Sequence, residues 1–158
     1  MEAVRVGRTA DAARCAELAA EAIAGVAGRR GGAMLVAREA PDPRVLTASR
    51  FAALMDAPGW LVLVGTLSGA VTGWSVCHVE TLPAGDRVVG RLDGLYVEPG
   101  ARGMGLGRLL LDAAVAWLAE QGCSGVDGAA LPGDREVKSL FEQAGFKARL
   151  LTMYRDIP

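Results

Sequence analysis

Residues 95–122 read LYVEPGARGMGLGRLLLDAAVAWLAEQG, and this stretch decides the fold. It begins as an apolar strand, passes through a loop with glycines at 103, 105 and 107, and continues as a helix predicted from about 105 to 121. The first turn of a helix leaves backbone N–H groups unpartnered and carries roughly half a positive charge. Glycines let a phosphate approach the backbone with no Cβ in the way. The loop, flanked by Arg102 and Arg108, is therefore predicted to hold an anion.

Three patterns of phosphate-binding loop compete for this segment. The triphosphate-binding pattern G-x-x-x-x-G-K-[ST] is absent, which disfavours a nucleotide triphosphatase. The dinucleotide pattern G-x-G-x-x-G fails because Arg108 stands where its last glycine is required, and the loop lies late in the chain. The third pattern, [QR]-x-x-G-x-[GA], is met by Arg102, Gly105 and Gly107.

Periodicity and turn residues predict the elements on either side of the loop. Strands are expected over residues 4–8, 60–67, 70–79, 88–97, 126–131 and 147–154. Helices are expected from Thr9 or Asp11 to about Val26, and over about 44–55, 105–121 and 134–144. The glycine- and arginine-rich stretch 25–32 is expected to be irregular, and Ser68-Gly69 predicts a hairpin turn. The chain contains no repeat and no linker, so we expect one domain over residues 1–158.

The composition excludes several classes of protein. A chain of 158 residues with 51% hydrophobic and 22% charged residues is typical of a globular domain that needs no disulfide or metal to fold. A net charge of −1 gives no general attraction to nucleic acid or to anionic membranes. The single histidine excludes sites that need two or three imidazoles, so no metal site is expected. No signal peptide and no membrane span is predicted, and three scattered cysteines are typical of reduced thiols, so a cytoplasmic location is expected.

Taken with the segment LFEQAGF at 140–146, the stretch 95–122 resembles the GNAT superfamily of N-acetyltransferases. The order of predicted elements is similar as well, so the resemblance covers nearly the whole chain and is strongest over 92–146. It implies an α/β (α+β) fold made of a single GNAT-like domain. The expected sheet is mixed, twisted and mostly antiparallel, with helices on both faces. It is expected to be splayed at its centre, between 88–97 and 126–131.

The resemblance also implies a co-substrate, acetyl-CoA or another acyl-CoA. Its pantetheine arm would lie in the splay against backbone groups of the 95–97 strand, and loop amides would hold its pyrophosphate. The residues expected to bind it are Leu95, Tyr96, Val97, Arg102, Gly103, Met104, Gly105, Leu106, Gly107, Arg108, Asp134 and Phe141. The small residues 128–130 fit this expectation, because a ligand that enters between strands needs room. The expected partner is a small-molecule or peptide amine acceptor, and the resemblance allows a homodimer.

Asp93 is the first candidate for the chemistry of amine acylation, which requires a neutral amine. It is an acidic residue inside an apolar strand, four residues before Val97 and so expected on the same face. The resemblance places an acidic residue near this position. A free aspartate is a weak base, so Asp93 would need a raised pKa or a relaying water, or it would only hold the substrate ammonium or a neighbouring loop. His78, a lone imidazole on a strand, is more typical of a structural or surface histidine than of a base.

The proton donor is where the sequence departs from the family pattern. Phe141 occupies the position at which the family usually has a tyrosine, and Asp134 stands where asparagine is common. Phenylalanine donates no proton, so the thiolate would be protonated by water or by Tyr154, for which simple packing is the alternative role. Arg29 and Arg30 lie in the loop expected to border the acceptor site, where they either select an anionic acceptor or are solvated.

Three functions are consistent with these observations to different degrees. The favoured function is an N-acetyltransferase that passes acetyl from acetyl-CoA directly to a primary amine. The alternative from another class is a catalytically silent domain that binds acyl-CoA as a sensor or interaction module, which Phe141 supports. A nucleotide-binding protein is disfavoured by the two failed motifs.

Overall fold

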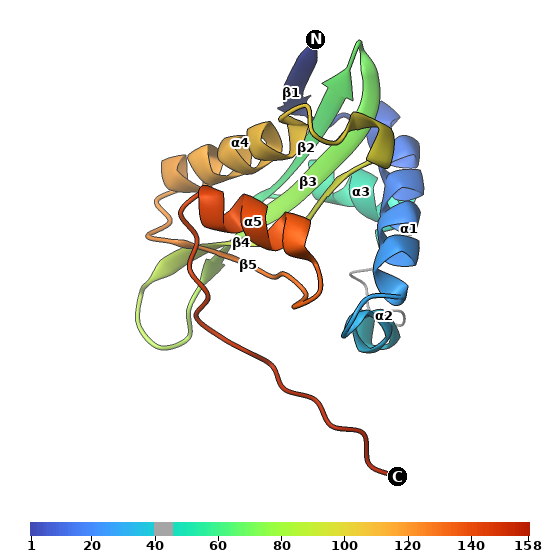
Figure 1. The fold of residues 1–158 in the computed structure, drawn as a ribbon. Coiled ribbons are helices and arrows are strands. Elements are labelled where there is room, and N and C mark those ends of the chain that lie inside the picture. Colours follow the sequence, from blue (N-terminus) through green and yellow to red (C-terminus); the bar gives the residue numbers. More distant parts are fainter. Residues whose placement is uncertain (40–45) are drawn as a thin grey trace.

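The computed structural model describes residues 1–39 and 46–158. The elements follow in the order β1 (Glu2–Val6), α1 (Ala12–Ala27), α2 (Gly32–Glu39), α3 (Ala48–Met55), β2 (Trp60–Leu67), β3 (Ala70–Thr81), β4 (Val88–Val97), α4 (Leu106–Glu120), β5 (Val126–Gly128) and α5 (Arg135–Gln143) (Figure 1). Short 3-10 turns stand at Thr9–Asp11 and Pro99–Ala101.

The strands form one mixed sheet with helices on both faces, as the sequence predicts. Its order is β1-β2-β3-β4-β5, with every neighbouring pair antiparallel except β4 and β5, which are parallel. Helices α1 and α3 cover one face, and α4 with α5 covers the other (Figure 1). No helix in the described ranges combines the length and the apolar character that a bilayer crossing requires.

The sheet opens between β4 and β5, which confirms the expected splay. The two strands pair at only three positions, from Gly90 opposite Val126 to Leu92 opposite Gly128. Strand β4 then continues to Val97, whereas β5 ends at Gly128. The last five residues of β4, 93–97, therefore present a backbone edge that β5 does not cover.

Two apolar cores lie on the two faces of the sheet. The α1 and α3 core contains Cys15, Leu18, Phe51, Leu54, Val62, Val64, Trp74 and Val76 among its buried members. The α4 core contains Leu61, Leu63, Cys77, Leu92, Val97, Leu106, Leu110, Leu111 and Leu118. Helix α4 rests on glycines of the sheet: a Cβ at Gly65 would lie 2.9 Å from Leu106, and one at Gly90 would lie 2.5 Å from Leu118. These glycines let the helix, and the loop before it, sit close to the strands.

Three sequence predictions differ from the structure. Helix α2 was not expected, because glycines precede it at 28, 31 and 32 and prolines follow it in the sequence at 41 and 43; the apolar residues 33–37 form a helix all the same. The part of the expected second helix, over 44–55, that precedes Leu46 lies outside the described residues, and α3 begins at Ala48 after a Thr47 cap. The expected strand over 147–154 is wrong, since these residues are exposed and irregular. Strand β5 keeps only three residues, and the chain after α5 is tied to it through an Arg149–Asp127 ion pair instead of a backbone ladder.

Candidate functional site

The start of α4 forms a cradle of backbone N–H groups. Gly103 and Gly105 have φ angles of 77° and 84°, a left-handed conformation that favours glycine. A Cβ at either position would meet nothing within 4 Å, so their conformation, and not crowding, requires glycine. No side chain caps the helix, while buried Leu106 fixes its first turn to the sheet. The N–H groups of this turn are therefore not engaged by a capping side chain, which is what the predicted anion site requires.

Arg102 and Arg108, the two arginines beside the cradle, bind protein groups around it. Arg102 donates through Nε to the Val97 carbonyl at 2.9 Å, and its guanidinium lies over the Tyr96 ring at 5.6 Å. Arg108 donates through Nε to the Asp112 carboxylate at 2.8 Å and through Nη1 to the carbonyl of Gln143, the last residue of α5, at 3.2 Å. The cradle is thus built from backbone, and the arginines hold its surroundings in place.

The open edge of β4 presents backbone groups of Leu95 and Val97. Glu98 donates its N–H to the Thr72 carbonyl at 2.9 Å, and hydrogen-bonded pairs alternate along an antiparallel ladder. Tyr96 therefore bonds toward β3, whereas the N–H and C=O of Leu95 and Val97 point to the splay. Arg102 already occupies the Val97 carbonyl. The N–H and C=O of Leu95 and the N–H of Val97 remain for a ligand.

Asp134 and Phe141, the two predicted site residues beyond the splay, have local partners. Asp134 caps α5 by accepting the Val137 N–H at 3.2 Å and forms an ion pair with Arg29. Phe141 packs on Phe146, with ring centroids 4.9 Å apart. A Cβ at Gly128 would lie 2.7 Å from the Phe141 ring, so the room that Gly128 provides is filled by Phe141.

The turn after α1 closes on the loop before α5. Besides the Arg29–Asp134 ion pair, a Cβ at Gly133 would lie 3.5 Å from Arg30, and one at Gly31 would lie 3.6 Å from Leu131. The guanidinium of Arg29 is therefore committed to Asp134. Its expected role as a selector of anionic acceptors gains no support from this contact.

Asp93 sits on a β-bulge at the vertex of the splay. The register of β3 and β4 shifts between Val76 and Cys77, which pair with Gly94 and Leu92 and leave Asp93 without a partner residue. The bulge reverses the alternation of faces. The expectation that Asp93 shares a face with Val97 is therefore wrong: Val97 packs in the α4 core, and Asp93 turns to the opposite face.

On that opposite face Asp93 pairs with His78. Its Oδ2 lies 2.6 Å from Nδ1 of His78, and both side chains are 18% exposed. The Trp60 ring stacks on the imidazole, with centroids 4.2 Å apart and planes 21° from parallel. The Nε of Arg91 lies 3.9 Å from Oδ1 of Asp93. The sequence predicts Asp93 as a candidate without indicating its partner, and it favours a structural or surface role for His78 over that of a base.

Tyr154 lies apart from this group. It stands in the irregular segment after α5 with 59% of its surface exposed, and a hydrogen bond to Asp156 raises the pKa of its phenol. Among residues 1–39 and 46–158, no hydrogen bond connects Tyr154 to Asp93, His78 or the loop before α4.

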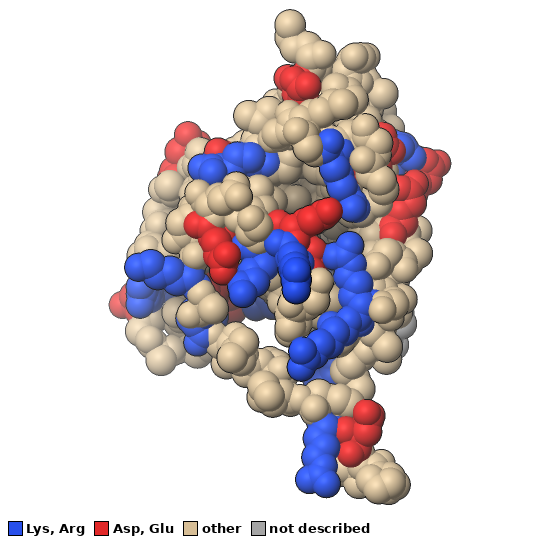
Figure 2. All heavy atoms as spheres, viewed as in Figure 1, with Lys and Arg blue, Asp and Glu red and all other residues tan. Residues whose placement is uncertain are grey.

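Basic side chains gather around the candidate site. Figure 2 shows Lys and Arg residues around a hollow near the middle of one face, between the segment that leads into α4 and helix α5, with acidic residues among them. The net charge of the chain is −1, so this gathering of basic side chains is a local feature of the surface.

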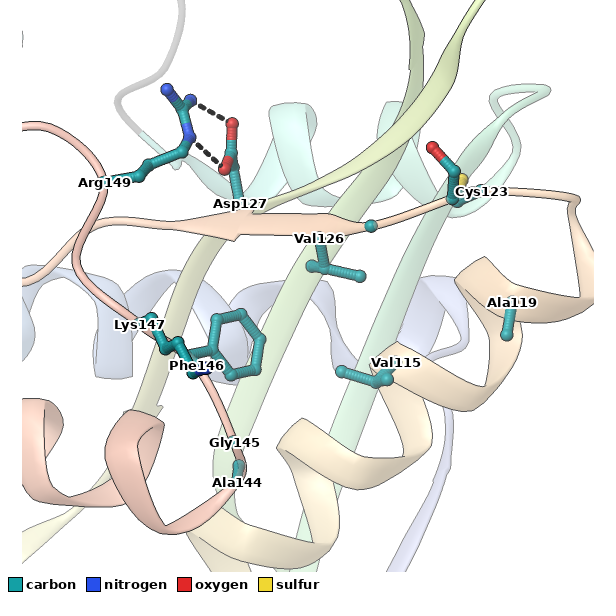
Figure 3. Close-up of a pocket in the computed structure, with 12 residues that line it drawn as sticks. Val115, Ala119, Cys123, Val126, Asp127, Ala144, Gly145, Phe146, Lys147 and Arg149 are labelled. Carbon is teal, nitrogen blue, oxygen red and sulfur yellow. Dashed lines mark hydrogen bonds and ion pairs between the residues drawn. The ribbon is translucent and has the colours of Figure 1, made fainter.

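A second pocket, of about 440 Å³, shares no residue with this site (Figure 3). Its lining comes from the end of α4, from β5 and from the turn after α5, and includes Val115, Ala119, Cys123, Val126 and Phe146. The Arg149–Asp127 ion pair closes one side and lowers the pKa of the Asp127 carboxyl. Burial raises the pKa of the Cys123 thiol, which disfavours a nucleophilic role.

Comparison with known proteins agrees with this geometry. The profile described as "Acetyltransferase (GNAT) family" matches residues 33–146. An aminoglycoside N(6')-acetyltransferase type 1 from Stenotrophomonas maltophilia is 30% identical over 108 residues, which cover 66% of this chain and 71% of that protein.

Solved structures share the fold over the whole chain. A mutant of the BH1408 protein from Bacillus halodurans matches with a TM-score of 0.80 and 19% identity, covering 99% of each chain. A ribosomal-protein-alanine N-acetyltransferase from Brucella melitensis biovar Abortus matches with a TM-score of 0.70 and 18% identity, covering 100% of each chain.

Proposed function

Because this chain belongs to the GNAT family and is an N-acetyltransferase, we propose that its donor is acetyl-coenzyme A and its acceptor the primary amine of a small molecule. One observation carries the donor assignment: an uncapped helix start directly follows the uncovered edge of β4. The strand edge and the anion cradle follow each other along the chain. Together they match a ligand that has an amide-bearing arm for the strand edge and a pyrophosphate for the cradle.

The N–H groups of residues 103–108 hold the pyrophosphate in this proposal. The arm lies along β4, where Leu95 and Val97 offer backbone groups to its amides. From Val97 to Gly94 the strand advances about 10 Å, which carries the arm from the cradle into the vertex of the splay. The thioester then lies beside the bulge at Asp93, where backbone N–H groups polarise its carbonyl.

The acceptor amine reaches the thioester from the α1 and α3 face, on which Asp93 and His78 lie. A carboxylate there attracts an ammonium group. A small-molecule acceptor is favoured because the relative at 30% identity is named for acting on an aminoglycoside.

Transfer is direct in this proposal, without a cysteinyl intermediate. Burial raises the pKa of Cys15 to about 11 and that of Cys77 to about 12, so neither thiol supplies much thiolate at neutral pH.

The test of this proposal measures the binding of the donor and the acetylation of candidate acceptors. Calorimetry with coenzyme A and acetyl-CoA measures donor binding, and release of free thiol measures transfer to a panel of amines: an aminoglycoside with a 6′-amine, a polyamine, a peptide with N-terminal alanine and a lysine peptide. We expect binding of both cofactor forms and turnover with a small-molecule amine. Turnover confined to peptides would contradict the acceptor class. Binding without turnover on a wide amine panel would favour the alternative of a silent acyl-CoA sensor.

A further inference from the structure

The pair formed by His78 and Asp93 leaves one ring nitrogen of the histidine free. Nδ1 is engaged by Asp93 at 2.6 Å, and the ring plane is fixed by the stacked Trp60. Nε2 forms no hydrogen bond with the residues described. Among the described residues, the buried side-chain polar atoms without a hydrogen-bond partner are Arg50 Nε, Thr72 Oγ1, Trp74 Nε1 and Ser75 Oγ. Nε2 of His78 is not one of them, and 18% of the His78 side chain is exposed, so residues 1–39 and 46–158 leave this atom neither paired nor enclosed.

A carboxylate at Nδ1 determines what Nε2 can do. The carboxylate accepts the Nδ1–H, so the neutral imidazole keeps its lone pair on Nε2. The same arrangement orients the histidine in hydrolases that use a carboxylate-held imidazole as a base. Imidazole ordinarily titrates near neutrality and suits general base catalysis there, whereas a free carboxylate is a weak base.

The place of the pair in the fold adds the second argument. Asp93 is the first residue of β4 beyond the part that β5 pairs, so the His78–Asp93 pair flanks the vertex of the splay. Both oxygens of Asp93 face other protein groups: Oδ2 contacts His78, and Oδ1 faces Arg91 at 3.9 Å. The accessible basic atom of this pair is Nε2 of His78.

We propose that Nε2 of His78 is the general base of the acetyl transfer and that Asp93 is a positioning residue that acts through it. This inference rests on the proposed function. His78 takes one proton from the acceptor ammonium, and the neutral amine forms a C–N bond to the acetyl carbonyl carbon while the C–S bond breaks. The amine loses its second proton to the departing sulfur, which leaves as the thiol. The imidazolium returns its proton to water, so atoms and charge balance.

A base at His78 explains how the reaction can proceed with Phe141 at the position where the family usually has a tyrosine. The amine itself carries the proton that the thiolate needs, so no phenol is required at position 141. It also leaves Tyr154 without a part in the reaction, in line with its exposed position after α5.

The test compares variants with the amine that the wild-type protein acetylates in the panel. We expect His78→Gln to lower kcat by about 10²- to 10⁴-fold, the usual cost of losing a general base, with an unchanged calorimetric Kd for acetyl-CoA. Asp93→Asn is expected to lower kcat by a smaller factor. Because the two residues act as one unit, the double variant is expected to be no slower than His78→Gln.

Two further measurements separate catalysis from folding. His78→Ala removes the ring from beneath Trp60, and we expect imidazole added to the buffer to restore part of its turnover, which a merely structural histidine would not show. Glu80→Gln is the matched control, since Glu80 lies two residues further along β3 and forms no ion pair among residues 1–39 and 46–158. Its kcat is expected to stay near that of wild type.

The outcomes distinguish the two proposals. Wild-type turnover combined with a His78→Gln kcat within about threefold of it would overturn the base while leaving the acetyl transfer intact. A further large loss when Asp93→Asn is added to His78→Gln would also overturn it, because Asp93 would then act on the amine itself. Failure of the wild-type protein to acetylate any amine would overturn the transfer and the base together.

Discussion

Gly105, the N-cap residue of α4, has a left-handed conformation, with open space where a side chain would project. We expect Gly105→Asp to abolish coenzyme A binding, because a carboxylate would add negative charge beside the N–H groups proposed to hold pyrophosphate. Calorimetric titration with coenzyme A measures this loss.

Gly69→Asp is the matched control for that residue. Gly69 has a φ of 86°, close to the 84° of Gly105, and equally open surroundings, but it lies in the turn between β2 and β3. The strain of about 1–2 kcal/mol for a non-glycine residue is common to both variants, so only the charge at the cradle differs. If Gly105→Asp bound coenzyme A as tightly as Gly69→Asp, the cradle would be misplaced.

Single residues also mark where prediction from sequence ends. The loop glycines and Asp93 could be identified because each interrupts an otherwise regular pattern. The partner of Asp93 could not, because a register shift between β3 and β4 intervenes. Continuing the Gly73–Val97 pairing without a shift would place Asp93 opposite Cys77, but the irregularity at Val76/Cys77 leaves Asp93 without a partner residue, and its carboxylate contacts His78. A bulge inserts one residue into a strand and need not interrupt its apolar pattern.

Among the elements, α4 depends on its close approach to β4. We expect Gly90→Ala to lower the free energy of unfolding by about 1–3 kcal/mol, because the new methyl group would collide with Leu118, 2.5 Å away. Urea denaturation measures the change.

The control for this contact is Gly125→Ala, at the residue whose carbonyl accepts the Gly90 N–H at 2.8 Å. A Cβ there meets nothing within 4 Å, so the variant is expected to be neutral or slightly stabilised. Equal losses in the two variants would show that the packing of α4 does not set the requirement for glycine.

Helix α5 is held at its start by Asp134, which both caps it and pairs with Arg29. Asp134→Ala removes both interactions and is expected to cost about 1–2 kcal/mol of unfolding free energy, whereas Asp134→Asn keeps a capping side chain and is expected to cost less. Thermal and urea denaturation of the two variants measure the difference. A loss in Asp134→Asn as large as that in Asp134→Ala would assign the stability to the ion pair alone.

Two elements differ from the sequence prediction, helix α2 and the segment after α5. In both, the periodicity of the segment itself does not determine its structure. Helix α2 is short and lies between a glycine-rich stretch and two prolines of the sequence, so these neighbours outweigh its apolar residues in a prediction. The segment after α5 is rich in apolar residues and was expected to be a strand, but strand formation needs a partner edge, and β5 offers only three residues. Pairing is a property of two segments, and a pattern in one of them does not reveal the other.

For the molecule as a whole, acid stability follows from ion pairs across elements. Arg5 on β1 donates to both oxygens of Asp11 at 2.7 and 2.8 Å, and this lowers the pKa of Asp11. A lowered pKa stabilises the folded state above the unfolded pKa, which is about 3.9, and this contribution is lost as the pH falls through the folded value. We expect Asp11→Asn to be less stable than wild type at pH 7, with the difference shrinking below about pH 4.

Asp56→Asn is the control for acid stability, since Asp56 is exposed and forms no ion pair among residues 1–39 and 46–158. Urea denaturation at pH 7 and near pH 3 is expected to give nearly equal stabilities for this variant and wild type at each pH. A deficit of Asp11→Asn that persists unchanged at pH 3 would assign it to the lost cap on the Arg8 N–H, and not to the charge of Asp11.

An indole ring shields protons that lie over its face, through the ring current that a magnetic field induces in it. Trp60 lies over the only imidazole in the chain, with centroids 4.2 Å apart. The two carbon-bound protons of that imidazole should therefore give isolated resonances, displaced upfield from those of free histidine, in an ordinary proton NMR spectrum. These two resonances report on the surroundings of His78 without isotope labelling. Their chemical shifts would change whenever a molecule binds beside the imidazole ring.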